Sequence, residues 1–289
     1  MAGESVLITG AGTGLGLETA VYLARQGFNV FASVYEDGQR EHVESREAKA
    51  QVTLNIIDLD ILNRDSIQAA VQTVLGQHGR IDALVNNAGV SLRGYFEDCE
   101  EAEIRRIVEV NLFGTMAVTR AVLPYMRAAR RGHLVFVSSV GGRIGSMART
   151  AYCASKFGLE GFAESLMQEV MPFGLKVSLV EPGLVSTERW TVHRGLAKGA
   201  MNPNSPYYEW FCRQEKLADQ LVQSSGISPD DVARTIYQAL TADRPRLRYV
   251  VGRRTSLILA LRRYIPGEIF ERLYFSEAMR RVTGSRNLS

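Results

Sequence analysis

Short apolar runs alternate along the chain with longer segments of helical periodicity. The runs are four to six residues long and lie at residues 5–9, 29–34, 52–57, 81–85, 133–138, 176–181 and 248–251. Strands that are apolar at nearly every position are typical of a parallel sheet covered on both faces. Periodic segments between the runs, such as 102–131 and 152–171, predict the covering helices. The pattern therefore predicts an α/β fold with a doubly wound parallel sheet.

Two stretches break this alternation. Residues 184–226 are rich in aromatic side chains and predict an insertion that forms a lid at the carboxyl rim of the sheet. A packed surface subdomain is the alternative for this stretch. Residues 253–289 alternate apolar and arginine-rich segments, which predicts a basic amphipathic extension. The chain thus divides into an α/β domain, residues 1–252, and an extension, residues 253–289.

Composition and charge sharpen this division. The chain has 289 residues, of which 46% are hydrophobic, enough for one large core with an appendage. The net charge is +3, but residues 244–289 hold eleven Arg and three Glu, about +8, which leaves about −5 on the rest. Such an extension can lie on an anionic membrane surface, or its apolar face can pack on the domain and cap a pocket. We favour the cap, and we expect no nucleic-acid partner.

The cysteines indicate the cellular compartment. Cys99, Cys153 and Cys212 have no metal-type spacing, which predicts reduced thiols, no metal site and a cytoplasmic location. We expect no signal peptide before the first strand. No uninterrupted apolar run reaches the ~18 residues that a membrane span needs.

A glycine-rich turn lies between the first strand and the first helix. Its sequence is Thr9-Gly10-Ala11-Gly12-Thr13-Gly14-Leu15-Gly16. Glycines in this context let the backbone turn tightly and approach a pyrophosphate, which the helix N-terminus then faces. A glycine-rich loop without a ligand is the alternative. The turn predicts a dinucleotide cofactor.

The second apolar run ends where such a cofactor would place its adenosine ribose. The junction is Tyr35-Glu36-Asp37, and Arg40 follows. Two carboxylates would repel the 2′-phosphate of NADP, so the junction favours NAD, while Arg40 keeps NADP open. After the third run, Asp60 is placed to accept from an adenine amino group, or it is an ordinary loop residue.

A second group of residues carries acid–base chemistry. Tyr152 and Lys156 are four apart, so a helix would place them on one face, about 6 Å apart along its axis. A nearby ammonium favours the phenolate and moves a pKa of ~10 towards working pH. Tyr152 could then act as a general acid or base. Asn111 lies in the middle of a long apolar helix, where a buried Asn needs partners.

Together these motifs resemble the short-chain dehydrogenase/reductase family over residues 5–252. They occur in the family's order, as Thr9-Gly10-x-x-x-Gly14-x-Gly16, Asn86-Asn87-Ala88-Gly89, Asn111, Ser139 with Tyr152-x-x-x-Lys156, and Pro182-Gly183-x-x-x-Thr187. The stretches 152–160, 172–177 and 181–183 are similar to the branch of retinol dehydrogenases, 17β-hydroxysteroid dehydrogenases and 3-hydroxybutyrate dehydrogenase. The resemblance implies a Rossmann-type, three-layer α/β/α fold and a homodimer or homotetramer.

The resemblance also implies a role for each matching residue. Tyr152 would exchange a proton with the substrate oxygen, Lys156 would bind the nicotinamide ribose, and Ser139 would donate to the substrate carbonyl. Asn111 would hold a water that links Lys156 to solvent. Contacts with the cofactor would come from Gly10, Thr13, Gly14, Leu15, Gly16, Tyr35, Asp60, Ile61, Asn87, Ala88, Gly89, Tyr152, Lys156, Pro182, Gly183, Val185 and Thr187.

The implied activity is an NAD(P)-dependent alcohol dehydrogenase or ketone reductase. A redox-sensing protein that binds the cofactor without turnover, and an epimerase or dehydratase of the same fold, remain alternatives. The expected pocket is mostly apolar, which suits a bulky hydrophobic alcohol or ketone: Leu92, Arg93, Phe96, Val140, Arg143, Met147, Arg149, Leu184, Trp190 and Tyr208. Arg93, Arg143 and Arg149 either meet a substrate carboxylate or lie solvated at the surface.

Overall fold

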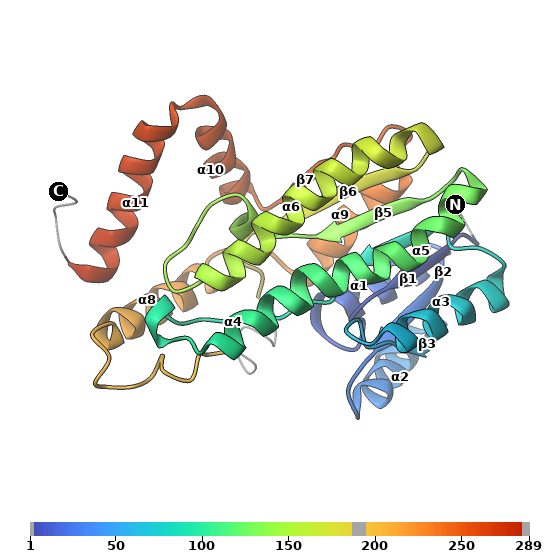
Figure 1. Ribbon diagram of the computed structural model, residues 1–289, viewed down its shortest axis with the longest axis horizontal. Coiled ribbons are helices and arrows are strands. Elements are labelled where there is room, and N and C mark those ends of the chain that lie inside the picture. Colours follow the sequence, from blue (N-terminus) through green and yellow to red (C-terminus); the bar gives the residue numbers. More distant parts are fainter. Residues whose placement is uncertain (1–2, 187–194, 285–289) are drawn as a thin grey trace.

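A parallel sheet of seven strands forms the centre of the computed structural model, which describes residues 3–186 and 195–284 (Figure 1). Its order is β3-β2-β1-β4-β5-β6-β7, and every neighbouring pair is parallel. The strands are β1 (Ser5–Ile8), β2 (Asn29–Val34), β3 (Asn55–Asp58), β4 (Ala83–Asn86), β5 (His133–Val137), β6 (Lys176–Pro182) and β7 (Arg248–Val251). The doubly wound sheet predicted from the apolar runs is confirmed.

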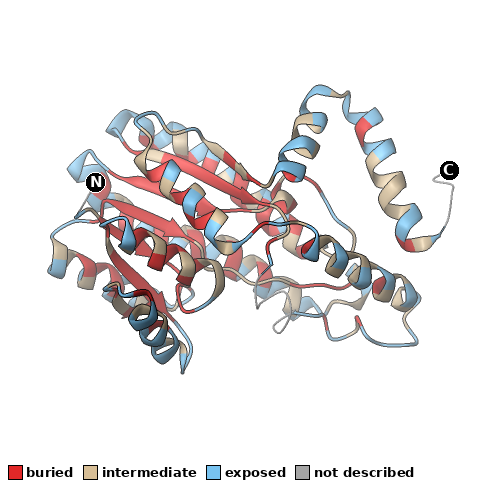
Figure 2. Ribbon diagram, turned by 180° about the vertical axis from the view of Figure 1, so that it is seen from behind, coloured by how far each residue is buried: buried red, intermediate tan, exposed pale blue. Residues whose placement is uncertain are grey.

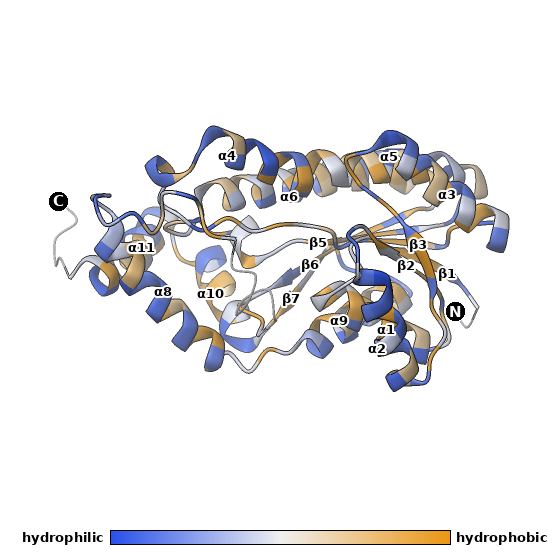
Figure 3. Ribbon diagram, turned by 90° about the horizontal axis from the view of Figure 1, so that it is seen from below, coloured by the Kyte–Doolittle hydropathy of each residue, from blue (hydrophilic) through white to orange (hydrophobic). Residues whose placement is uncertain are grey.

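Helices cover both faces of the sheet, as Figure 3 shows from below. One face carries α1 (Gly14–Arg25), α2 (Gln39–Ala50) and α9 (Pro229–Thr241). The other carries α3 (Arg64–His78), α5 (Thr115–Ala129) and α6 (Thr150–Val170), and α4 (Glu101–Val108) packs against α6. Successive strand residues alternate between the two cores: Leu7 packs towards α3 and α5, and Ile8 packs towards α1. The strands are therefore buried on both faces (Figure 2).

Two helical features differ from the sequence pattern. The long helix predicted at 102–131 is interrupted by a π-helical segment, η2 (Glu109–Gly114), which contains Asn111. Helix α2 was not predicted, because it has few apolar residues and buries only Val43 and Ala50. Its Arg46 instead pairs with Glu18 of α1 at 2.8 Å.

The stretch Glu101–Ala129 is the one candidate membrane span among residues 3–186 and 195–284, by length and composition. No uninterrupted apolar run within this stretch was long enough to predict a membrane span from the sequence. The stretch packs against the sheet beside α3 and α6, as a core helix of an α/β domain does.

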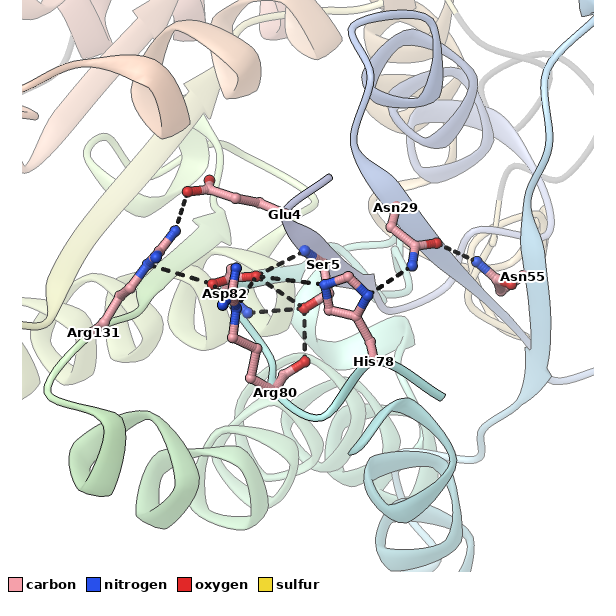
Figure 4. A network of polar contacts seen from close by, with 8 residues as sticks. All are labelled: Glu4, Ser5, Asn29, Asn55, His78, Arg80, Asp82 and Arg131. Carbon is pink, nitrogen blue, oxygen red and sulfur yellow. Dashed lines mark hydrogen bonds and ion pairs between the residues drawn. The ribbon is translucent and has the colours of Figure 1, made fainter. Parts of the chain in front are cut away.

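The amino ends of the strands are closed by a polar network (Figure 4). Asp82, before β4, accepts from the backbone N–H of Ser5 at 2.9 Å and from Arg80 Nε at 2.9 Å. Arg131 reaches both Asp82 and Glu4. Asp82 is 6% exposed, and its charge is balanced by these guanidinium groups. The network therefore lies at the amino ends of the strands, whereas the glycine-rich turn lies at the carboxyl end of β1.

The insertion and the extension pack against each other. Within the insertion, α8 (Tyr208–Gln223) follows a turn in which Ala197 and Ala200 are buried with Leu92. Trp190 and Thr187 lie outside the described residues. The extension is a hairpin of α10 (Arg253–Tyr264) and α11 (Gly267–Thr283), in which α11 returns beside α8 (Figure 1).

Shorter elements complete the chain: η1 (Phe96–Asp98), η3 (Val140–Gly142) and η4 (Met171–Phe173).

Candidate active site

Lys156 lies beneath the carboxyl end of β5. It is on α6, four residues after Tyr152, and only 6% of it is exposed. Its Nζ donates to the backbone carbonyl of Val137 at 2.8 Å. A buried ammonium needs such partners, and this bond fixes the amine close to the strand that Ser139 follows.

Ser139 and Tyr152 meet at Gly141. A Cβ on Gly141 would lie 3.2 Å from Tyr152 Cε1 and 3.5 Å from Ser139 Oγ. The Ser139 hydroxyl caps η3 by accepting from the Gly141 N–H at 3.1 Å. Arg149 places its guanidinium 5.7 Å from the centre of the Tyr152 ring. The structure thus brings the serine, the tyrosine and the lysine to one place.

Asn111 joins this group from η2. It is fully buried, and its Oδ1 accepts from the Val90 N–H at 2.7 Å. Its Nδ2 donates to the Val90 carbonyl at 2.9 Å and to Ser155 Oγ at 3.0 Å. The sequence expectation that a buried Asn has a task is met by these bonds. The water relay implied for Asn111 stays a prediction.

The glycine-rich turn is tied to the end of β4. Thr9 Oγ1 accepts from the N–H groups of Asn87 and Ala88, both at 3.0 Å. Asn87 Nδ2 donates to the carbonyls of Thr9 and Gly10, also at 3.0 Å. β1 and β4 are neighbours at the point where the strand order reverses. Ligands of doubly wound sheets bind in the crevice at this point.

The turn has the shape that a pyrophosphate requires. Gly10 and Gly14 have positive φ angles of 63° and 57°. A Cβ on Gly16 would lie 2.2 Å from the Gly10 carbonyl, so only glycine fits there. Thr13, the N-cap residue of α1, makes no side-chain cap, and no acidic residue occupies the first turn. These residues fit a dinucleotide, whose phosphates would meet the N-terminus of α1.

The adenosine end is defined by β2 and β3. Gln39 Oε1 accepts from the Tyr35 N–H at 3.0 Å. Arg40 pairs with Asp58 at 2.9 Å. Asp60 Oδ1 accepts from the Leu62 N–H at 2.8 Å, a loop-forming bond.

The nicotinamide end lies after β6. Gly183 packs against Thr255 of α10, with 2.1 Å between an added Cβ and Thr255 Oγ1. Val185 bridges to Ile227. Gly89 lies beside Asn111, and Ile61 packs against Gly114 of η2; their contact with a cofactor stays a prediction. Thr187 lies outside the described residues.

Two of the three candidate pocket arginines are engaged by carboxylates of the chain. Arg93 is 3% exposed and pairs with Glu215 of α8 at 2.9 Å, so it is not a solvated surface residue. Arg143 pairs with Glu181 at 2.9 Å. Leu92 is buried, whereas Phe96 is 60% exposed. Met147 accepts from Gln214 of α8 through its carbonyl. Val140, Leu184 and Tyr208 are half-buried.

Sequence reasoning missed three residues of the site. Ser155 accepts from Asn111 and donates to the Tyr152 carbonyl at 2.7 Å. Glu160 and Glu181 are buried below the catalytic group. Burial, and then the neighbouring Glu160, raise the pKa of Glu181 to about 7. Glu160 falls on the same helix face as Lys156, four residues on, which was the available signal for it.

A short-chain dehydrogenase model matches residues 4–194. The chain belongs to the short-chain dehydrogenase family. Retinol dehydrogenase 8 of Bos taurus is 36% identical over 277 residues, which cover 93% of this chain and 88% of that protein. Human 17-beta-hydroxysteroid dehydrogenase type 1 is 34% identical over 269 residues, with coverages of 91% and 81%. Mouse mitochondrial D-beta-hydroxybutyrate dehydrogenase is 32% identical over 290 residues, with coverages of 94% and 84%. The branch predicted from three short stretches is confirmed.

Solved structures of this family agree with the fold. A short-chain dehydrogenase from Streptomyces avermitilis superposes with a TM-score of 0.77 at 30% identity, over 99% of this chain and 100% of that one. A metagenomic short-chain oxidoreductase in complex with NADP has a TM-score of 0.68 at 28% identity, with coverages of 87% and 97%. A Burkholderia phymatum short-chain dehydrogenase/reductase in complex with NAD shares the fold at 24% identity and TM-score 0.76, with coverages of 90% and 92%. This family member is an NAD(P)-dependent oxidoreductase.

Proposed function

We propose that the chain interconverts a bulky hydrophobic alcohol and its carbonyl compound, using Tyr152 as the acid/base. The observation that carries the proposal is the meeting of Ser139 and Tyr152 at Gly141, with Lys156 held below them at Val137. When bound, the nicotinamide supplies or accepts the hydride. The turn at Gly10, Gly14 and Gly16 fits the pyrophosphate of such a cofactor.

Each residue of the site then has a physical task. The phenol of Tyr152 exchanges a proton with the substrate oxygen, and the buried Lys156 ammonium favours the phenolate. Ser139 Oγ donates to the same oxygen, where negative charge develops. Asn111 fixes the carboxyl end of β4 to α6 and holds the water that connects Lys156 with solvent.

We propose NAD as the preferred cofactor. Arg40, which follows the β2 junction and could attract a 2′-phosphate, is paired with Asp58 at 2.9 Å and bonded to the Ile56 carbonyl. Glu36 accepts from Gln39 at 3.1 Å and keeps its carboxylate at the same corner. Negative charge at this corner would therefore repel a 2′-phosphate, whereas a 2′-hydroxyl could donate a hydrogen bond to a carboxylate.

The apolar lining supports a hydrophobic substrate. Leu92, Ala148, Ala151 and Phe211 form a buried cluster beside the catalytic turn, together with Ala197 and Ala200 of the insertion. Ion pairing of Arg93 and Arg143 removes two of the arginines that a substrate carboxylate would need. Relatives named for retinol and 17β-hydroxysteroids agree with this chemistry.

The test is a panel of retinoids, steroids, aryl alcohols and hydroxy acids, each run with NAD and with NADP. We expect nicotinamide absorbance to change with at least one apolar alcohol and to change faster with NAD. Turnover of the hydroxy acids alone would contradict the apolar substrate. Cofactor binding without turnover of any compound would point to a redox sensor, and product formation without net cofactor change to an epimerase or dehydratase.

We also propose a homo-oligomer that works in the cytoplasm. Phe113 and Phe157 are 52% and 42% exposed on the adjoining segments η2 and α6, an apolar face that a second copy would cover. The three free cysteines support a reducing compartment. Light scattering should show a dimer or tetramer, and a concentration-independent monomer would contradict it.

The extension contributes a further contact. Its α11 packs beside α8 of the insertion, which supports our expectation that the extension packs on the domain and caps the pocket. Helix α10 has three exposed apolar side chains at helical spacing: Leu257, Leu261 and Tyr264, which are 61%, 43% and 79% exposed. Arg253 and Arg254 lie at the start of the same helix. This face suits peripheral contact with an anionic membrane. Equal sedimentation with phosphatidylserine vesicles of the full chain and of a Leu257→Ser/Leu261→Ser variant would contradict that contact.

A further inference from the structure

A buried charged cluster lies between α6, the carboxyl end of β6 and the first residue of β7. It contains two glutamates that are almost inaccessible to solvent, Glu181 at 0% and Glu160 at 5% exposure. Arg248 of β7 bridges them, with its Nε 3.0 Å from Glu160 Oε2 and 3.3 Å from Glu181 Oε1. Arg143 also pairs with Glu181, and Glu164 of α6 pairs with Arg248.

The cluster joins the three segments that carry the active site. Arg143 follows η3, the turn that Ser139 caps. Glu160 is one helical turn after Lys156 on α6. Glu181 directly precedes Pro182 and Gly183 at the end of β6.

These segments pack closely against one another. A Cβ on Gly142 would lie 2.8 Å from Ser138 Oγ, 3.0 Å from Glu160 Cγ and 3.0 Å from the Lys156 carbonyl. The η3 turn therefore rests directly on α6 between Lys156 and Glu160. Movement of Glu160 or Arg143 would displace Ser139 relative to Tyr152.

The charges of the cluster do not balance when every carboxyl is ionised. Three glutamates, Glu160, Glu164 and Glu181, face two arginines. Within residues 3–186 and 195–284, neither Glu160 Oε1 nor Glu181 Oε2 has a hydrogen-bond partner. Two buried carboxylates that share Arg248 repel each other, and one added proton would relieve this repulsion.

We propose that the Glu160–Glu181 pair takes up one proton as pH falls through neutral and, through Arg143 and Arg248, acts as a positioning device for Ser139 and the Tyr152–Lys156 turn. The elevated pKa of Glu181, about 7, which has burial as its main cause, agrees with this assignment. Glu181 faces Glu160 from α6, Arg143 from the turn after β5, and Arg248 from β7, while Glu164 of α6 pairs with the far side of Arg248. The inference rests on the proposed function for its catalytic readout.

The first experiment tests whether Glu181 is protonated in the folded chain, and it needs no substrate. The folded pKa of Glu181 lies above its ordinary value of 4.5, so the associated stability is present at low pH and is lost as pH rises from 4.5 through about 7. Glu181→Gln imitates the protonated form. We expect its Tm to rise relative to that of the natural chain between pH 5 and pH 8. A pH-independent Tm difference would overturn the proposal.

The second experiment measures positioning. We expect kcat/KM of the natural chain to show an ionisation near pH 7 that disappears in Glu181→Gln and persists in Asp230→Asn, which breaks an exposed ion pair on α9. Arg143→Met should lower kcat about 10-fold or more with an unchanged cofactor Kd, and Arg143→Lys should restore part of it. An unaltered profile in Glu181→Gln, or equal kcat values for Arg143→Met and the natural chain, would overturn the proposal. Absence of turnover in the natural chain would contradict the proposed function alone, and the Tm measurement would still decide where the proton lies.

Discussion

Asn111 donates from its side-chain amide to the hydroxyl of Ser155 at 3.0 Å, and this bond ties η2 to the helix that carries Tyr152. Ser155 Oγ in turn donates to the Tyr152 carbonyl at 2.7 Å. The same Asn111 side chain bonds both backbone groups of Val90, beyond β4. One buried amide thus sets the position of the catalytic turn relative to the cofactor crevice.

Replacing Asn111 should therefore affect stability as well as turnover. Asn111→Ala leaves the N–H and carbonyl of Val90 without their partners, which should cost about 1–3 kcal/mol in free energy of unfolding. Chemical denaturation measures this cost, and kcat should fall with it. Ser155→Ala keeps both Val90 bonds and serves as the control, with a smaller loss. Equal stability of Asn111→Ala and the natural chain would contradict the account.

Asp58 should control cofactor choice through Arg40. Asp58→Asn removes the charge that holds Arg40 and frees the guanidinium for a 2′-phosphate, so KM for NADP should fall several-fold, as expected for one charge-assisted contact at an exposed site. The double variant Asp58→Asn/Arg40→Met lacks the guanidinium and should not show the gain. The same KM for NADP in both variants would mean that Arg40 does not reach the phosphate.

His133 should make folding sensitive to acid. It lies buried at the start of β5, with Nε2 3.0 Å from Ser178 Oγ, and burial together with Lys176 lowers its pKa to about 3. The folded state therefore resists a proton that the unfolded chain takes up near 6.5, so stability is lost as pH falls from 6.5 towards 3. His133→Gln should show a shallower acid decline of Tm than the natural chain, whereas exposed His42→Gln should not. Parallel declines would contradict this.

The Arg93–Glu215 pair should anchor the insertion. Both partners are shielded, so Glu215→Gln removes a carboxylate from the buried Arg93 guanidinium and should lower the free energy of unfolding by about 3 kcal/mol. Glu209→Gln breaks an exposed pair on the same helix and should cost under about 1 kcal/mol. Hydrogen exchange of α8 amides should accelerate in the first variant alone. Similar exchange in both would show that the pair does not anchor α8.

Local signals account for what the sequence predicted. The strands were readable because a doubly covered sheet leaves most positions of β1, β2, β4 and β5 apolar and buried, and the turn at Gly10 because its positive φ favours glycine. Helix α2 was missed because it buries only Val43 and Ala50 and so has no continuous apolar face. The segment η2 was missed because an apolar period does not distinguish α- from π-helical turns.

Pairing between residues distant in the sequence explains which contacts could not be predicted from it. Arg93 pairs with Glu215, 122 residues later, and Arg143 pairs with Glu181, 38 residues later. Pairing over such separations produces no periodic pattern in the sequence. The sequence alone therefore left both arginines available to contact a substrate. Ser155 sits inside the Tyr-x-x-x-Lys motif, but its bond to Asn111 depends on how η2 and α6 cross.

The central claim is that Tyr152 transfers the proton in a site that otherwise binds the cofactor normally. The most direct measurement compares kcat and NAD affinity of the natural chain, Tyr152→Phe and Tyr125→Phe, a tyrosine on α5. The account predicts that Tyr152→Phe loses at least about 10²-fold in kcat, the contribution of a positioned acid or base, with the Kd for NAD unchanged. Tyr125→Phe should keep full activity. Undiminished turnover in Tyr152→Phe would contradict the account.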